Sequence, residues 1–421
     1  MAPDPAVRLA WQILPVYTKR TLSRFDRSGN SGAGEGRSVA SRRVADLARL
    51  RVDQVGSLLR PPRLKAMFAR HHQGQITEQE LREAQDEAIL EVITTQEAHD
   101  LPILTDGEFR RLNFMESFGE VAGMEAWQAQ WNELLRELEG ERRASAQSVE
   151  RGWEPVVRVP QPVRSRLRLV RNRPLEEFQY AQSLTDRPVK VTLINTDRIC
   201  EGFERENSRA VYPTAEEFLA DVVAVERQIV SGLVEAGCRY IQIDGPSYTR
   251  YADERSLEAM RSRGEDPLTN LDRAIAADNT VIAGFSGVIF GLHLCRGNRQ
   301  SQWHREGFYD AIAERIFQGL RHHRLLLEYD TERAGTFEPL RYLPKDKIAV
   351  LGLITTKTGR VETVNELKRR LDEAARYASL DQLALSPQCG FSSDMAGNFL
   401  SEDDQWRKLD VMRETAAQVW G

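Results

Sequence analysis

Cysteine and histidine are scarce in this chain, and long apolar runs are missing. The 421 residues include only four cysteines and seven histidines. Cys200, Cys238, Cys295 and Cys389 are widely scattered, which is not typical of a disulfide framework and predicts a reducing compartment such as the cytoplasm. No stretch approaches about 18 consecutive apolar residues, so no segment is predicted to span a membrane.

A strong charge of either sign is also missing. The formal net charge is −5 and charged residues make up 29% of the chain. Neither value suggests nucleic acid or a membrane surface as the main partner. A hydrophobic content of 41% is enough for a sizeable core, in one large domain or two medium ones. No GxGxxG follows the first strand-like run, which argues against a dinucleotide-binding domain.

Residues 1–49 differ from the rest of the chain. They are rich in Arg, Ser and Gly and poor in acids, and "SGNSGAGEGRS" at 28–38 is predicted to be a flexible linker. The Arg and Ser bias also resembles an organelle transit peptide, so mitochondrial targeting stays open beside a cytoplasmic location with a disordered tail.

From residue 50 onward, strand-like apolar runs alternate with helical patterns. This alternation predicts parallel strands joined by right-handed crossovers. Eight such runs over residues 50–421 indicate a (β/α)₈ TIM barrel, with a doubly wound open sheet as the alternative. The eight runs end near Ser57, Glu108, Asn195, Asp244, Cys295, Glu328, Thr356 and Cys389.

The largest irregularity is an insertion at residues 121–180, between the second and third strands. Its first part, residues 125–143, reads as an amphipathic helix, and "VRSRLRLVRNRP" at 163–174 reads as an edge hairpin or extended arm. An insertion of this size is expected to act as a lid or as a contact in a homo-oligomer.

His293 and Cys295 stand two positions apart at the end of the apolar run "GLHLC". On a strand this spacing points both side chains to the same face, toward the barrel interior. An imidazole and a thiolate together suit zinc, although a buried cysteine beside a hydrogen-bonded histidine is the simpler explanation of the pair alone. Glu328 and Cys389 end two later strands and would complete a Cys₂HisGlu zinc site.

With these residues the chain resembles the catalytic domain of cobalamin-independent methionine synthase and its single-barrel relatives, which include epoxyalkane:coenzyme M transferases. The zinc motif of that family, H-x-C followed by a strand-end Glu and then a Cys, is similar to "HLC", "LLLEYD" and "SPQCG" here. Three further stretches, "VGSLLRPP", "DGEFRRLNFMESFGE" and "IQIDGP", resemble family motifs in the same order. The resemblance covers roughly residues 50–421.

The resemblance implies zinc-dependent methyl transfer to a thiol, with homocysteine as substrate and methionine as product. A zinc-bound thiol persists as a thiolate at neutral pH and can attack a methyl carbon. Ser57 would hold the substrate carboxylate, while Glu108 and Asp244 would hold its α-ammonium. Two carboxylates favour an amino thiol over coenzyme M, which carries no amine.

The methyl donor stays open, because the chain departs from the family pattern in two places. A tail of 49 residues stands where full-length members carry a second barrel. Lys357, in "TTKTG", stands near the place of the histidine proton donor, and lysine is the poorer acid at neutral pH. The donor is a methylated folate, a methylated corrinoid or another compound. The alternatives are alkyl transfer from an epoxide to coenzyme M, a non-catalytic zinc-stabilised barrel, and a zinc hydrolase.

Overall fold

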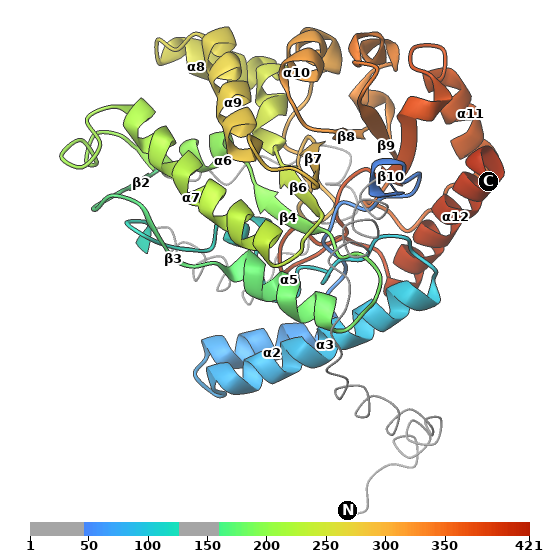
Figure 1. Cartoon of the computed structure of the whole chain (residues 1–421), viewed down its shortest axis with the longest axis horizontal. Helices are drawn as coiled ribbons and strands as arrows, with labels where there is room; N and C mark the ends of the chain where they lie inside the picture. The colour runs from blue at the N-terminus through green and yellow to red at the C-terminus, as the bar shows by residue number, and fades with distance from the viewer. Residues whose placement is uncertain (1–45, 126–159) are drawn as a thin grey trace, which may run out of the picture. The chain divides into compact units, whose positions relative to one another are not determined.

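Six parallel strands and two further extended segments form a closed barrel (Figure 1). The computed structural model describes residues 46–125 and 160–421, which lie in one compact unit. The six strands run side by side in the order β10-β9-β8-β7-β6-β4. Their bounds are β4 Val191–Ile194, β6 Tyr240–Asp244, β7 Ile289–Leu294, β8 Arg324–Glu328, β9 Ile348–Ile354 and β10 Leu383–Pro387.

Two short segments before β4 close the barrel. The segment containing Val52 bridges β10 in parallel, and the segment containing Leu104 bridges the residues just before β4 in the same way. A backbone hydrogen bond of 3.1 Å from Leu58 to Gly107 joins the two segments to each other. The predicted eight-membered (β/α)₈ barrel is therefore confirmed, and the open sheet is not adopted.

Helices surround the strands on the outside of this barrel (Figure 1). The helical patterns of the sequence include residues 77–99, 214–237 and 401–420, which form α3, α7 and α12. The α-helices are α2 Pro62–His72, α3 Glu78–Ala98, α5 Arg173–Ser183, α6 Thr196–Cys200, α7 Ala215–Glu235, α8 Glu254–Ser262, α9 Pro267–Ile282, α10 Ala313–Gly319, α11 Val364–Ala374 and α12 Glu402–Trp420.

Capping residues explain where the long helices begin. The Thr77 hydroxyl accepts the backbone N–H of Glu80, and the Glu80 carboxylate accepts the backbone N–H of Thr77. Thr363 starts α11 with the same reciprocal pair, and the Thr214 side chain caps α7. Each cap satisfies backbone donors that the first helical turn leaves free, which stabilises a helix by about 1 kcal/mol.

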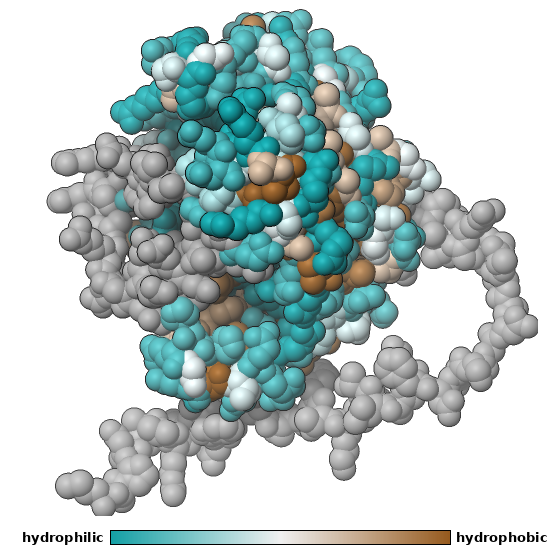
Figure 2. Space-filling model, turned by 90° about the vertical axis from the view of Figure 1, so that its left-hand side faces the viewer, coloured by the Kyte–Doolittle hydropathy of each residue, from teal (hydrophilic) through white to brown (hydrophobic). Residues whose placement is uncertain are grey.

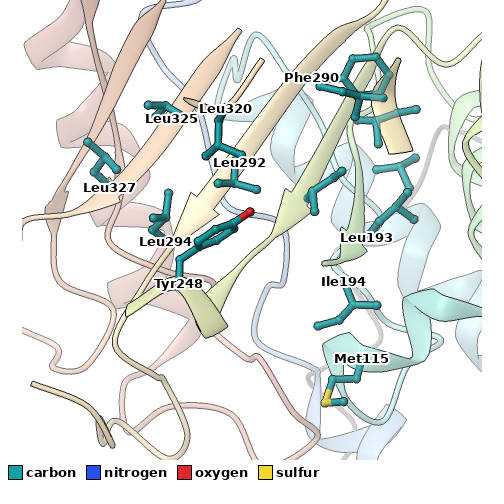
Figure 3. Packing of buried hydrophobic residues seen from close by; sticks show 14 of the residues in the cluster. Met115, Leu193, Ile194, Tyr248, Phe290, Leu292, Leu294, Leu320, Leu325 and Leu327 are labelled. Atoms are coloured by element: carbon teal, nitrogen blue, oxygen red, sulfur yellow. The ribbon is translucent and has the colours of Figure 1, made fainter. Parts of the chain in front are cut away.

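Side-chain alternation along the strands separates two buried regions. Leu292 and Leu294 of β7, with Leu325 and Leu327 of β8, belong to the large cluster packed between strands and helices (Figure 3). A separate cluster from the first barrel segment and three neighbouring strands fills the barrel interior, with Val55, Leu326, Val350 and Ala384. Because His293 alternates with Leu292 and Leu294, its side chain points into the barrel.

The two segments predicted to be irregular are described only in part. Of the predicted tail, residues 1–45 lie outside the described residues, while Leu47 is buried against Ile103, Tyr240 and Ile289. Leu47 therefore packs with the barrel.

In the predicted insertion, residues 126–159 lie outside the described residues, and these include nearly all of the expected amphipathic helix. On either side, β1 (Glu120–Ala122) pairs antiparallel with β3 (Arg168–Arg171), so part of the expected arm is extended. A second small pair is parallel, between β2 (Gln161–Pro162) and β5 (Phe203–Glu204).

The surface formed by the described residues is mostly hydrophilic on the face drawn in Figure 2. Figure 2 shows a face on which hydrophilic residues dominate and hydrophobic ones are exposed in small groups. Within the described ranges, none of the helices combines the length and the apolar content needed to cross a bilayer.

Candidate metal and substrate site

Three of the four predicted metal ligands come together at the C-terminal end of the barrel. His293 lies on β7, Cys295 follows its end, and Cys389 follows β10. Their potential ligand atoms all lie within 4.8 Å of one another, and all three side chains are buried. The spacing H-x-C thus gives two inward-facing donors, and the end of a second strand supplies the third.

The donor atoms of this group suit a metal ion. Neither ring nitrogen of His293 has a hydrogen-bond partner among the described residues, which is costly for a buried imidazole. A hydrogen bond from Cys389 lowers the pKa of Cys295 well below its ordinary value, and the same contact raises the pKa of Cys389. The charges of Cys295, Asp244 and Glu328 raise the pKa of His293 despite its burial. Two sulfur atoms and an imidazole within 4.8 Å fit zinc, which prefers sulfur and nitrogen ligands.

Glu328 ends β8 but lies outside this group of three. Its carboxylate accepts a hydrogen bond of 2.5 Å from the backbone N–H of Arg296 and another from the Arg333 side chain. Burial alone would raise the pKa of Glu328, but the charges of Lys357, Arg333 and Arg296 lower it to about 2. Glu328 is therefore an ionised carboxylate beside the group, with an arginine as its present partner.

Asp244 lies next to the group, opposite His293 in the register of β6 and β7. Its Oδ1 atom accepts a hydrogen bond of 2.7 Å from the Gln242 amide. Burial raises the pKa of Asp244 to about 7; the nearby His293 opposes this shift and the Glu108 carboxylate adds to it. The two predicted ammonium-binding carboxylates thus act on each other electrostatically across the barrel mouth.

Glu108 reaches the mouth through an unusual backbone conformation. Its φ of 60° lies in the left-handed region, and its N–H donates to Asp106 Oδ1 at 2.9 Å. Glu108 Oε1 accepts a hydrogen bond of 2.8 Å from the Thr192 hydroxyl. Glu108 Oε2 is buried without a partner in the part of the chain that the structure describes, so it is free to accept from a ligand.

Ser57 packs against the loop that carries Cys389. The carbonyl of Ser57 accepts the Phe391 N–H at 2.9 Å. A Cβ atom at Gly390 would lie 2.0 Å from Ser57 Oγ, so only glycine allows this approach. Gly390 was not singled out from the sequence, although its place directly after a predicted ligand is the signal that could have found it.

Lys357 follows β9 and is 4% exposed. Its Nζ atom makes no hydrogen bond to any described residue. It lines a cavity of about 340 Å³ together with Trp303, Asp330 and Arg333. The cavity therefore borders both the arginine that binds Glu328 and the predicted proton donor.

Comparison with known proteins shows to which family this chain belongs. Residues 52–418 match the model of the cobalamin-independent synthase catalytic domain. The chain belongs to the cobalamin-independent methionine synthase family. Membership confirms the resemblance inferred from the sequence motifs and supports methyl transfer as the class of reaction. The match begins at residue 52 and lends no support to mitochondrial targeting.

Two curated relatives of the family show how far the similarity extends. The uncharacterized protein YxjH of Bacillus subtilis (strain 168) is 34% identical over 380 residues, which cover 89% of this chain and 95% of the relative. The methionine synthase of Pyrococcus abyssi is 25% identical over 340 residues, covering 80% of this chain and 84% of that enzyme.

Solved structures of family members share the fold. The putative vitamin-B12-independent methionine synthase from Listeria monocytogenes has a TM-score of 0.67 at 24% identity, covering 88% of this chain and 98% of its own. The B12-independent methionine synthase from Shewanella sp. W3-18-1, in complex with selenomethionine, has a TM-score of 0.62 at 16% identity, covering 88% and 97%. These likenesses agree with the barrel described above.

Proposed function

We propose that this chain is a zinc-dependent thiol S-methyltransferase that converts homocysteine to methionine. The observation that carries the proposal is the buried group of His293, Cys295 and Cys389, whose ligand atoms lie within 4.8 Å of one another. Because both ring nitrogens of His293 lack a partner among the described residues, this group offers donors that the fold itself does not use. Family membership supports the transfer of a methyl group.

Zinc held by these three residues would supply the Lewis acidity that keeps a substrate thiol as a thiolate at neutral pH. Glu328 is the proposed fourth donor, because it ends the strand beside β7 and is ionised. Arg333 and the backbone of Arg296 keep that carboxylate at the mouth of the barrel.

The amino-acid end of the substrate would be bound by carboxylates on two other strand ends. Glu108 Oε2 is buried and free, and Asp244 lies opposite His293 on the neighbouring strand. Both would accept hydrogen bonds from the ammonium group, and Ser57 would donate to the carboxylate. This arrangement favours homocysteine over coenzyme M, which offers no amine to either acid.

Lys357 is the proposed proton donor. It would protonate the part of the methyl donor that is released when the methyl group is transferred. Lys357 follows β9, its charge acts on the Glu328 carboxylate, and its amino group is buried without a hydrogen-bond partner among the described residues. A positioned side chain of this kind commonly contributes about 10²–10⁴-fold to a rate. The donor itself, a folate, a corrinoid or another methylated compound, is identified by the assay below.

The test is an assay on the purified full chain after its zinc content has been measured. The protein is incubated with homocysteine and, in turn, methyltetrahydrofolate with one or three glutamates, methylcobalamin and S-methylmethionine, and the product is identified by mass spectrometry. We expect methionine with at least one donor. The parallel reaction of mercaptoethanesulfonate with epoxypropane tests the coenzyme M alternative, and turnover there alone would replace the proposal.

Cysteine variants test the metal site itself. Cys389→Ser should reduce zinc from one ion per chain to a small fraction, because a hydroxyl is a poor substitute for a thiolate ligand. Cys238→Ser is the matched control, since Cys238 is equally buried but its sulfur donates to the backbone of Tyr240. Retention of zinc by both Cys295→Ser and Cys389→Ser contradicts the assignment.

A further inference from the structure

Gln242 connects a buried lysine to Asp244 through the barrel interior. It precedes Asp244 by two positions on β6, so both side chains point inward. The Gln242 amide nitrogen donates to Asp244 Oδ1 at 2.7 Å and to the Val55 carbonyl at 2.8 Å. Its amide oxygen accepts from Lys190 Nζ at 2.8 Å. Because an ammonium only donates and a carbonyl only accepts, the amide has one orientation, with its N–H groups toward Asp244.

Thr192 connects a buried arginine to Glu108 in the same manner. Arg111 donates to Thr192 Oγ1 at 2.8 Å, and Arg111 is itself bound to Glu177 at 2.6 Å. A guanidinium cannot accept a hydrogen bond, so the hydroxyl oxygen of Thr192 is the acceptor. The hydroxyl proton is then directed to Glu108 Oε1, which lies 2.8 Å away.

Each carboxylate consequently has one oxygen bound by the fold and one left for a ligand. Glu108 Oε2 is buried with no partner among residues 46–125 and 160–421. The side-chain hydrogen bond that Asp244 accepts from the described residues goes to Oδ1, from Gln242, which leaves Oδ2 for a ligand. Two single oxygens on different strand ends suit an ammonium, which presents several donors to separate acceptors.

We propose that Gln242 and Thr192 are positioning residues that hold Asp244 and Glu108 with one free oxygen each, and so make the site selective for thiols that carry an amine. The inference rests on the proposed function. The direction of both hydrogen bonds is set by buried cations, Lys190 and Arg111, and Arg111 also forms an ion pair of 3.7 Å with the bound oxygen, Glu108 Oε1. A thiol without an amine would leave both free oxygens unpaired and gain nothing from this arrangement.

The test compares the binding of two thiols to the zinc-loaded protein by calorimetry. Homocysteine and its analogue without the amine, 4-mercaptobutyrate, differ only at the group concerned. Gln242→Met and Thr192→Val keep the side-chain volume but remove the donor to one carboxylate. Each should lower the affinity for homocysteine by about 10-fold to 100-fold, the usual effect of losing a hydrogen bond to a charged group. The affinity for 4-mercaptobutyrate and the zinc content should stay as in the unmodified protein.

Matched variants separate positioning from a general loss of stability. Gln96→Met removes another buried amide, which binds the carbonyls of Val92 and Thr105, and Thr415→Val removes a buried hydroxyl on α12. Both controls should leave the ratio of the two affinities unchanged.

The inference is overturned if Gln242→Met and Thr192→Val weaken the binding of both thiols equally, so that the ratio of the two affinities is unchanged. It is also overturned if these variants lose their zinc. If Gln242→Met does not fold, Thr192→Val decides alone. Failure of homocysteine to bind the unmodified zinc-loaded protein removes the proposed function and the inference with it. Binding that is unaffected by either variant removes the inference only.

Discussion

The two ends of the barrel differ in how their buried polar groups are paired. At the N-terminal end, Asp53 Oδ1 binds Lys190 at 2.8 Å. Asp53 Oδ2 accepts from the Tyr240 hydroxyl at 2.6 Å and from Arg324 Nε at 3.2 Å. This Asp53 cluster, composed of these four residues, is fully buried, and its one carboxylate compensates two cations.

At the C-terminal end, several buried atoms have no partner. Both ring nitrogens of His293, the Nζ atom of Lys357 and Oε2 of Glu108 make no hydrogen bond within the described residues. Unpaired buried polar atoms cost free energy, so a fold retains them where a ligand pairs with them. The comparison indicates that the paired charges stabilise the barrel and that the unpaired ones bind substrate and metal.

The largest expected effect is on stability at the paired end. Lys190→Met removes one cation from the Asp53 cluster and leaves the carboxylate with less compensation in a buried environment. We expect the free energy of unfolding to fall by roughly 3–5 kcal/mol, measured by urea denaturation of the metal-free protein. A midpoint equal to that of the unmodified protein would show that the cluster contributes no stability.

The same substitution at the other end should act on catalysis instead. Lys357→Met removes an ammonium that makes no hydrogen bond to any described residue. Its free energy of unfolding should fall by less than that of Lys190→Met, because the loss is the charge attraction to Glu328 and no hydrogen bond, while methyl transfer to homocysteine falls by about 100-fold, the low range for a lost proton donor. Homocysteine affinity should be retained. A destabilisation as large as that of Lys190→Met would contradict the distinction between the two ends.

Much of the fold could be predicted from sequence, because strands buried on both sides leave strong apolar runs. Strands β6 and β8 end at Asp244 and Glu328, as predicted. The first two barrel segments were predicted as strands but form only isolated bridges at Val52 and Leu104. Their hydrogen bonds depend on neighbours far along the chain, which local patterns do not contain.

The site could be predicted to the level of residue types but not of contacts. The H-x-C spacing places His293 and Cys295 on one face, since strand periodicity is two. The pairing of Glu328 with Arg333 was not predicted, because it depends on how a loop folds back after the strand. Gln242 was also missed, although a polar residue inside the strand "YIQID" is a signal of an inward-facing interaction.

His322 lies at the paired end of the barrel without a partner of its own among the described residues and gives the smallest expected effect. It immediately precedes β8, is fully buried, and its ring nitrogens find no partner in the described part of the chain. Burial lowers the pKa of His322 from 6.5 to about 3, with contributions from the charges of Lys347 and His323. The folded protein therefore keeps this imidazole neutral over a range in which the unfolded chain binds a proton.

The consequence of this lowered pKa is a loss of stability in acid. As the pH falls from 6.5 toward 3, the unfolded state gains a proton that the folded state does not, so this residue reduces stability by about 1.4 kcal/mol per pH unit. His322→Leu fills a similar space without a titrating group and should flatten the decline between pH 6.5 and 4.5, with little change at pH 8. Urea midpoints across this range measure the effect, and parallel curves for the two proteins would mean that His322 is paired or protonated in the folded state.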